Sequence, residues 1–158
     1  MSTFTRPDVW LASGLRTPFA KVDGALAGHD AIALSVPVVQ AMLAQLGGAQ
    51  PDFTVWGSVV PNLTWSNLAR EILMEAGAPP TIPAFSTIMA CSTSMVGTFE
   101  AAGMLDGKAR KLALVGGVES LSRVQIGLGQ TLSDWLRKFT KSRTAGDKLK
   151  QLAALQLS

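Results

Sequence analysis

The sequence predicts an α/β protein in which short strands and helices alternate around a layered sheet. Two observations carry this prediction. Short apolar, β-forming runs alternate with longer runs that have helical spacing, and Gly or Pro ends most of them. Hydrophobic residues make up 47% of the 158 residues, enough for one domain with a core, which argues against disorder. Such alternation is typical of sheets whose functional residues lie at the carboxyl ends of the strands.

The beginning of the chain predicts a strand, a loop and a helix. Residues 8–12 are a short apolar run ended by Ser-Gly, so we expect a first strand and then a glycine-rich loop through Gly28. Asp30 can cap a helix over residues 31–46, which ends at a Gly-Gly pair. Because proline has no backbone N–H, we expect Pro37 either to start the main helix after a first turn or to kink it.

The following segments continue the alternation. We expect strands over residues 53–60, 84–89 and 111–117, and helices over residues 68–76 and 95–105. Ser66 or Asn67 can cap the first of these two helices. The last of these strands is apolar, as expected for the middle of a sheet that is covered on both faces. The predicted order is therefore β-α-β-α-β-α-β.

The last segment differs in charge from the rest. Residues 1–122 carry 7 basic and 9 acidic side chains, whereas residues 123–158 carry 7 and 2, a balance of +5. We therefore divide the chain into an α/β domain over 1–122 and a basic, largely helical segment over 123–158. Apolar residues at helical spacing favour a solvated helix face over a nucleic-acid arm or an anionic-surface binder. They are Trp135, Leu136, Phe139, Leu149, Leu152, Leu155 and Leu157.

Several classes of protein are excluded. Mean hydropathy is +0.28, yet no run of about 18 uninterrupted apolar residues occurs, so we expect no transmembrane helix. The only cysteine, Cys91, cannot form an internal disulfide, and with the only histidine, His29, it cannot build a zinc cage, so we predict no metal site. The beginning of the chain has neither a signal-peptide nor a presequence pattern, so we expect a cytoplasmic protein.

Cys91 is the candidate catalytic residue. It follows a predicted strand and precedes a predicted helix, where unpaired N–H groups and the helix dipole favour a thiolate. Ser92, Thr93 and Ser94 are small and polar, so they can cap that helix without crowding an incoming group. From position alone, the alternative is that Cys91 is a small buried apolar side chain, as most lone cysteines are.

Three short motifs occur along the first 122 residues. Residues 16–19 (Arg-Thr-Pro-Phe), followed by Lys21, lie in the first loop, residues 91–94 (Cys-Ser-Thr-Ser) at a strand-to-helix turn, and residues 116–122 (Gly-Gly-Val-Glu-Ser-Leu-Ser) after the next strand. In order and spacing they resemble the amino-terminal signatures of the thiolases. The segment 90–122, followed by the basic helical stretch from Trp135 onward, is most similar to the thiolase subunit of fatty-acid β-oxidation trifunctional complexes. The resemblance implies a thiolase-like layered fold, a single amino-terminal βαβαβαβ half plus the start of a basic, largely helical loop region.

The resemblance also implies a reaction. In thiolases the cysteine that matches Cys91 attacks the ketone of a 3-ketoacyl-CoA, holds the shortened acyl chain as a thioester and passes it to a second CoA, or runs the reverse Claisen condensation. The chain would then be the nucleophile-bearing half of a 3-ketoacyl-CoA thiolase, an acetyl-CoA acyltransferase of lipid metabolism. Coenzyme A is its substrate, no cofactor is permanently bound, and no residue is assigned to CoA. Ser94 and Met95 stand where thiolases usually have a small residue, and Leu121 where Met is more usual.

Thiolases resemble two copies of one α/β domain, and the second copy supplies the catalytic histidine, a second cysteine and the carbonyl-binding groups. We therefore expect His29 to be structural or solvent-facing, and Glu119 to be a hydrogen-bonding anchor rather than an acid catalyst. The high content of hydrophobic residues fits a protein with an apolar surface that a complementary carboxyl-terminal half covers. The resemblance also implies a homodimer and, in trifunctional complexes, a β-oxidation partner subunit. Nucleic acid is not an expected partner.

Two other functions stay open. One is a catalytically silent assembly subunit or fragment that kept the thiolase fold. The other is a related condensing enzyme, a ketoacyl or hydroxymethylglutaryl synthase, which shares a cysteine at the mouth of a helix, although the motifs at 16–19 and 116–120 argue against it. As a whole, the basic segment suits the phosphates of CoA or a phospholipid surface, whereas each of its residues alone fits a solvated helix face.

Overall fold

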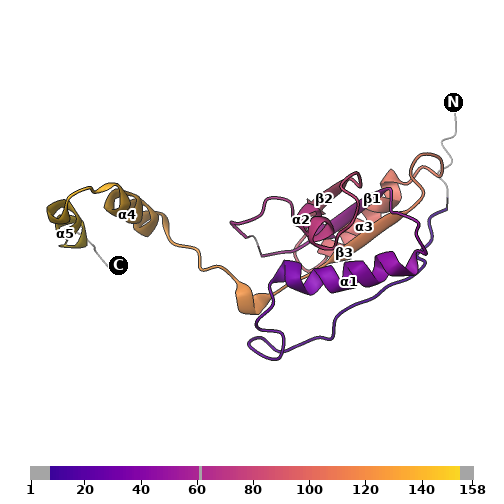
Figure 1. Cartoon of the computed structure of the whole chain (residues 1–158), viewed down its shortest axis with the longest axis horizontal. Coiled ribbons are helices and arrows are strands. Elements are labelled where there is room, and N and C mark those ends of the chain that lie inside the picture. Colours follow the sequence, from indigo (N-terminus) through magenta and orange to yellow (C-terminus); the bar gives the residue numbers. More distant parts are fainter. Residues whose placement is uncertain (1–7, 61, 154–158) are drawn as a thin grey trace. The chain divides into compact units, whose positions relative to one another are not determined.

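The computed structural model describes residues 8–60 and 62–153. The chain divides into two compact units, unit 1 up to Val124 and unit 2 from Gln125 onward. Figure 1 labels the helices and strands of both units.

Unit 1 is built on a three-stranded parallel sheet with the order β2-β1-β3 (Figure 1). Strand β1 (Phe53–Gly57) lies in the middle, between β2 (Ala84–Thr87) and β3 (Ala113–Gly117). In the register of the sheet, Val55 lies opposite both Phe85 and Val115. All five residues of β1 are buried, because this strand is paired on both edges and covered on both faces.

Helices cover the two faces of the sheet. Helices α1 (Ala31–Gln45) and α2 (Leu68–Glu75) pack against each other on one face. Helix α3 (Thr93–Met104) lies on the other face and contacts all three strands. Because side chains alternate between the faces of a strand, each strand contributes to both layers of core. The result is a three-layer α/β/α arrangement.

Each face of the sheet has its own apolar cluster. On the α1 and α2 side, Trp56 and Leu114 pack with side chains of both helices. The indole N–H of Trp56 donates a hydrogen bond of 3.1 Å to the buried hydroxyl of Ser35 on α1. The same indole covers Gly116 on β3, where a Cβ atom would overlap the ring. Trp56 therefore joins α1, β1 and β3.

Helices α1 and α2 begin at capping residues that the sequence predicts. The Asp30 carboxylate accepts the N–H of Ala33 at 2.8 Å, so it caps α1. The Asn67 side chain accepts the N–H of Arg70 at 3.2 Å and caps α2. Pro37 lies inside α1, which begins at Ala31 and does not start again at the proline.

Two predictions about the strands are wrong. Residues 8–12 form no strand, and Trp10 and Leu11 are 84% and 85% exposed. A strand needs a neighbour to bond its backbone groups, and no strand among the described residues pairs with this segment. Strand β3 lies at an edge rather than in the middle, because β1 is its one partner within residues 8–60 and 62–153. The observed order in unit 1 is therefore α-β-α-β-α-β.

Unit 2 consists of helices α4 (Gln130–Lys141) and α5 (Ala145–Ala153). Trp135 stacks on Phe139 with ring centroids 5.2 Å apart, and its indole N–H donates to the carbonyl of Gln151 at 2.7 Å. Neither helix has a buried residue. Two of the apolar residues predicted for this segment, Leu155 and Leu157, lie outside the described residues. In the part of the chain that is described, no helix is both long and apolar enough to span a membrane.

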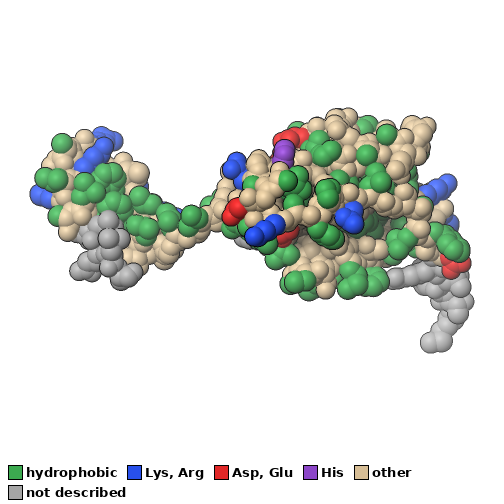
Figure 2. Space-filling view, turned by 90° about the horizontal axis from the view of Figure 1, so that it is seen from below, with side chains coloured by type: hydrophobic (Ala, Val, Ile, Leu, Met, Phe, Trp, Pro, Cys, Tyr) green, Lys and Arg blue, Asp and Glu red, His purple; other side chains and the backbone are tan. Residues whose placement is uncertain are grey.

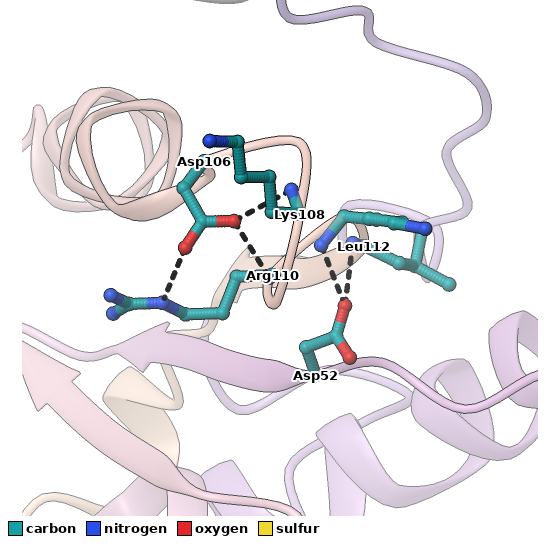
Figure 3. A network of polar contacts seen from close by, with 6 residues as sticks. Asp52, Asp106, Lys108, Arg110 and Leu112 are labelled. Atoms are coloured by element: carbon teal, nitrogen blue, oxygen red, sulfur yellow. Dashed lines mark hydrogen bonds and ion pairs between the residues drawn. The ribbon is translucent and has the colours of Figure 1, made fainter.

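Two aspartates bind the backbone of the segment that leads into β3 (Figure 3). The Asp52 carboxylate accepts the N–H groups of Lys111 at 2.7 Å and Leu112 at 2.9 Å. Asp106 accepts the N–H of Arg110 at 2.9 Å in the turn just before. These bonds to backbone N–H groups favour the charged carboxylate, so the pKa of each aspartate is lowered from its usual value of 3.8.

We expect Asp52→Asn to flatten the dependence of thermal stability on pH. The native pKa of Asp52 lies below 3.8, so its carboxylate stabilises the fold above that pH. This contribution disappears as the pH falls through the native pKa, whereas asparagine cannot ionise. Tm measured from about pH 6 down to about pH 2 should therefore fall less in the variant than in the parent. Lys111→Gln keeps both backbone donors and removes only the smaller attraction of the Lys111 charge, so its profile should stay closer to the parental one than that of Asp52→Asn. Identical profiles for Asp52→Asn and the parent would contradict the interpretation.

Candidate active site

Cys91 lies in the tight turn between β2 and α3. The hydroxyl of Thr93 accepts the N–H of Met89 at 2.9 Å and donates to the carbonyl of Ala90 at 2.7 Å. The N–H of Ser92 donates to the carbonyl of Met89 at 3.0 Å. Ala90 has a φ of 44°, in the left-handed region that residues other than glycine seldom adopt. The turn therefore holds a strained residue directly before Cys91, and the Cys91 side chain is exposed.

The polar residues after Cys91 do not act as the sequence predicts. Ser92 stands at the N-cap of α3, but its side chain makes no capping bond. The Thr93 hydroxyl bonds the turn that precedes the helix instead. The start of α3 therefore has no side-chain cap at its N-cap residue, and the positive end of its dipole begins two residues after Cys91.

Two glycines allow α3 to approach the sheet. A Cβ atom on Gly57, at the end of β1, would collide with Thr93 Cγ2 and with the carbonyl oxygen of Thr87. A Cβ atom on Gly117, at the end of β3, would lie 3.1 Å from Ser94 Cβ, which is tighter than about nine in ten such contacts. The first turn of α3 therefore rests on the carboxyl ends of β1 and β3, and this contact places the Cys91 turn.

Glu119 joins the loops that follow β1 and β3. Its carboxylate accepts the hydroxyl of Ser58 at 3.0 Å and the N–H groups of Val59 at 2.8 Å and Val60 at 3.3 Å. Strand β1 therefore ends at Gly57 and does not reach the predicted residue 60. The backbone N–H groups of residues 59 and 60 bind the Glu119 carboxylate. Glu119 is thus engaged as a hydrogen-bonding anchor, in agreement with the interpretation of its motif.

The first and third motifs line one groove. This groove has a volume of about 420 Å³, and residues 13–22 and 114–122 form two of its walls. In the first motif, the Arg16 guanidinium lies 4.8 Å from the centre of the Phe19 ring. Ser122 connects the two walls, because its hydroxyl accepts the N–H of Asp23 at 2.8 Å. Cys91 does not line the groove. Gly117 lines it and also contacts the first turn of α3, which follows Cys91.

His29 does not join Cys91 in a described interaction. It lies at the end of the first loop with an exposed side chain, and its carbonyl accepts the hydroxyl of Ser120 at 2.7 Å. The backbone carbonyl of His29 therefore makes this hydrogen bond. Within the described residues, no cluster of three His, Cys, Asp or Glu side chains could hold a metal ion.

Comparison with known proteins identifies the family. The family model described as "Thiolase, N-terminal domain" matches residues 9–153. The chain belongs to the thiolase family. Among curated thiolases, the 3-ketoacyl-CoA thiolase of Pseudoalteromonas translucida is 34% identical over 149 residues, and that of Yersinia enterocolitica is 36% identical over 149 residues. Each match covers 93% of this chain and 34% of the relative.

A solved thiolase structure has the same fold. The Bacillus anthracis acetyl-CoA acetyltransferase is 28% identical and superposes with a TM-score of 0.69 over 74% of this chain and 30% of that chain. This chain therefore spans about a third of the length of the thiolases it matches. The family assignment covers the α/β unit and the two helices of unit 2, since the match runs from residue 9 to residue 153.

Two residues that organise the Cys91 turn are not predicted from the sequence. The sequence predicts Thr93 only as a cap of the helix and assigns no role to Gly57. The sequence contains a signal for Gly57, because this glycine ends β1 directly before the Ser-Val-Val segment that Glu119 binds. Only the three-dimensional contact of α3 with the strand ends shows why a side chain is excluded there.

We expect Thr93→Val to destabilise the chain more than Thr93→Ser does. Valine has the shape of threonine but leaves the N–H of Met89 without the hydroxyl, at a cost of about 1–3 kcal/mol in the free energy of unfolding. Serine keeps both hydrogen bonds and loses one methyl group, worth about 0.8 kcal/mol. Urea unfolding of the two variants measures the difference. Equal losses, or a larger loss for serine, would show that the hydroxyl does not hold the turn.

Proposed function

We propose that this chain is the nucleophile-bearing part of a 3-ketoacyl-CoA thiolase and that Cys91 is the nucleophile. The observation that carries the proposal is the exposed Cys91 side chain in the strained turn before the uncapped start of α3. Reactive cysteines are partly exposed, whereas structural cysteines are buried and inert. The names of the relatives, 3-ketoacyl-CoA thiolases, favour this reaction over that of a condensing synthase.

The chemistry divides one carbon–carbon cleavage into two acyl transfers. The Cys91 thiolate attacks the C3 carbonyl of a 3-ketoacyl-CoA, the C2–C3 bond breaks, and the shortened acyl group stays on Sγ as a thioester. The electron pair of the broken bond leaves with C2, which takes a proton and departs as acetyl-CoA. The thiol of a second CoA then loses its proton, attacks the thioester and releases the shortened acyl-CoA, which restores the thiolate. In the opposite direction the same steps form a carbon–carbon bond.

The proton transfers need groups from the remaining part of a thiolase. His29 is bonded through its backbone at the end of the first loop, and Glu119 is occupied by three donors after β1, so neither is our candidate base. A complementary carboxyl-terminal half is therefore part of the proposal, together with acyl-CoA substrates. A homodimer, a β-oxidation partner subunit and a cytoplasmic location remain predictions from the sequence.

Trapping the thioester tests the proposal. The full chain, co-purified with the carboxyl-terminal part of the Yersinia enterocolitica thiolase, is mixed with acetyl-CoA and its intact mass is measured. We expect the chain to gain one acetyl group on Cys91, its only cysteine. Addition of free CoA should remove that group, because the second transfer consumes the thioester.

The matched control is Cys91→Ser, which changes only the sulfur atom. This variant should gain no CoA-removable acetyl group and should lose thiolysis of acetoacetyl-CoA by about a thousandfold or more. Unlabelled Cys91 in the complete mixture, or thiolysis that survives in Cys91→Ala, would favour a catalytically silent assembly subunit and overturn the proposal.

A further inference from the structure

The short segment that carries Cys91 has little packing of its own. All four residues of the segment 88–91, which connects β2 to the start of α3, are exposed. Because no side chain in this segment is buried, its path depends on hydrogen bonds and on the residues at its two ends. At the downstream end, the Thr93 hydroxyl bonds two backbone groups of the turn. The upstream end is Thr87, the last residue of β2.

Thr87 is held by β1 and by α3. Its carbonyl oxygen lies beside Gly57 of β1, so close that a Cβ atom on this glycine would collide with it. Its methyl group lies against α3, because Thr87 Cγ2 would be 3.4 Å from a Cβ atom on Gly97. Its hydroxyl donates a hydrogen bond of 3.1 Å to Oε1 of Glu100, on the same helix. Helix α3 therefore holds both branches of the Thr87 side chain.

One face of α3 holds both ends of the segment that carries Cys91. Thr93, Gly97 and Glu100 are spaced four and three residues apart, so they share a face of the helix. Thr93 and Gly97 are buried against the sheet on this face. Thr93 binds the backbone just before the helix, and Glu100, two turns further along, binds the residue that ends β2. The two hydrogen-bonding side chains thus lie on either side of the nucleophile in the path of the chain.

Glu100 is an unusual residue for its place in the fold. It is the one charged side chain in α3 and in the three strands of the sheet. Other charged side chains lie on the surface, where Figure 2 shows Lys, Arg, Asp and Glu on the outside of unit 1. Glu100 is half-buried, and its Oε2 atom is buried without a hydrogen-bond partner in the described part of the chain. No ion pair between described residues includes it.

Such a placement costs stability. A buried carboxylate oxygen without a donor loses its hydrogen bonds to water, and an apolar side chain of similar size would avoid this loss. Local arrangements that cost stability are expected where a residue serves the function of a site. Among the described residues, the Glu100 carboxylate bonds the hydroxyl of Thr87. This bond is therefore where a functional role of Glu100 would be exerted.

We propose that Glu100 is a positioning residue for Cys91 and that it acts through the hydroxyl of Thr87. The bond fixes the point where β2 ends, from which residues 88–90 lead to the nucleophile. It thereby fixes the direction in which Sγ meets the C3 carbonyl of the substrate, and a misplacement of about 1 Å can slow a reaction about a hundredfold. The inference rests on the proposed function, in which Cys91 is the nucleophile.

A double-mutant cycle tests the bond. Glu100→Leu, Thr87→Val and the double variant are each co-purified with the carboxyl-terminal part of the Yersinia enterocolitica thiolase. We expect each single variant to lower kcat for thiolysis of acetoacetyl-CoA by about tenfold or more, with KM within about twofold of the parental value. Because both residues act through one bond, the double variant should lose no more than the weaker single variant. Urea unfolding should show the double variant to be as stable as the parent, since both polar partners are gone.

Two further variants separate the bond from other effects. Glu100→Gln removes the charge but keeps an oxygen that accepts the Thr87 hydroxyl, so it should retain kcat within about twofold. Thr98→Val is the matched control on the same helix. Its hydroxyl donates to the carbonyl of Ser94 at 2.9 Å, within α3, so its loss should leave kcat within about twofold as well.

Three results would overturn the inference. One is a Glu100→Leu variant that keeps the parental kcat. Another is a double variant whose loss is the product of the two single losses, because the residues would then act independently. The third is a Glu100→Gln variant that loses as much as Glu100→Leu, because the charge rather than the bond would then matter.

The failure of this inference can be told apart from failure of the proposed function. A parent complex in which acetyl-CoA leaves Cys91 unlabelled contradicts the reaction. The rate at which iodoacetamide modifies Cys91 in the full chain alone still tests the position of the thiol, since it needs no acyl transfer. We expect Glu100→Leu, Thr87→Val and the double variant to change this rate by one common factor of about threefold or more. A Glu100→Leu chain that is modified at the parental rate contradicts the positioning role.

Discussion

The first turn of α3 lies so close to the carboxyl end of β1 that only glycine fits there, and it lies close to the carboxyl end of β3 as well. Gly57 contacts Thr93, and Gly117 contacts Ser94, so both strand ends meet the helix that follows Cys91. This approach leaves no room for a side chain at Gly57, and the Thr93 hydroxyl lies in the turn, where it bonds Met89 and Ala90. The exposed Cys91 and Ala90, with its left-handed φ, both lie in this turn.

The edge of the same sheet bears on the high content of hydrophobic residues. A parallel sheet needs cover on both faces and a neighbour on each inner strand. Helices α1, α2 and α3 cover the faces of the sheet, and among the described strands β3 is an edge strand without protecting charges. The exposed apolar residues near the start of the chain lie beside a groove rather than in a membrane-spanning helix.

Local signals in the sequence predicted much of this fold. Asp30 and Asn67 cap helices where a side-chain acceptor precedes an apolar run, since capping depends on neighbouring residues alone. The segment 8–12 shows the limit, because its β-forming composition becomes a strand only beside a partner that these residues lack. Cys91 was located by its place between a strand and a helix. The roles of Thr93 and Gly57 could not be predicted, because they depend on how closely α3 approaches the sheet.

The most direct measurement of this close approach compares Gly57→Ala with Gly103→Ala. Both add one methyl group, but a Cβ on Gly103 in α3 meets nothing within 4 Å. Gly57→Ala should lower the free energy of unfolding by about 1–3 kcal/mol and change the rate at which iodoacetamide modifies Cys91. Gly103→Ala should raise the stability by about 0.5–1 kcal/mol and leave that rate unchanged. If Gly57→Ala keeps both the stability and the alkylation rate of the parent, the contact does not place the Cys91 turn.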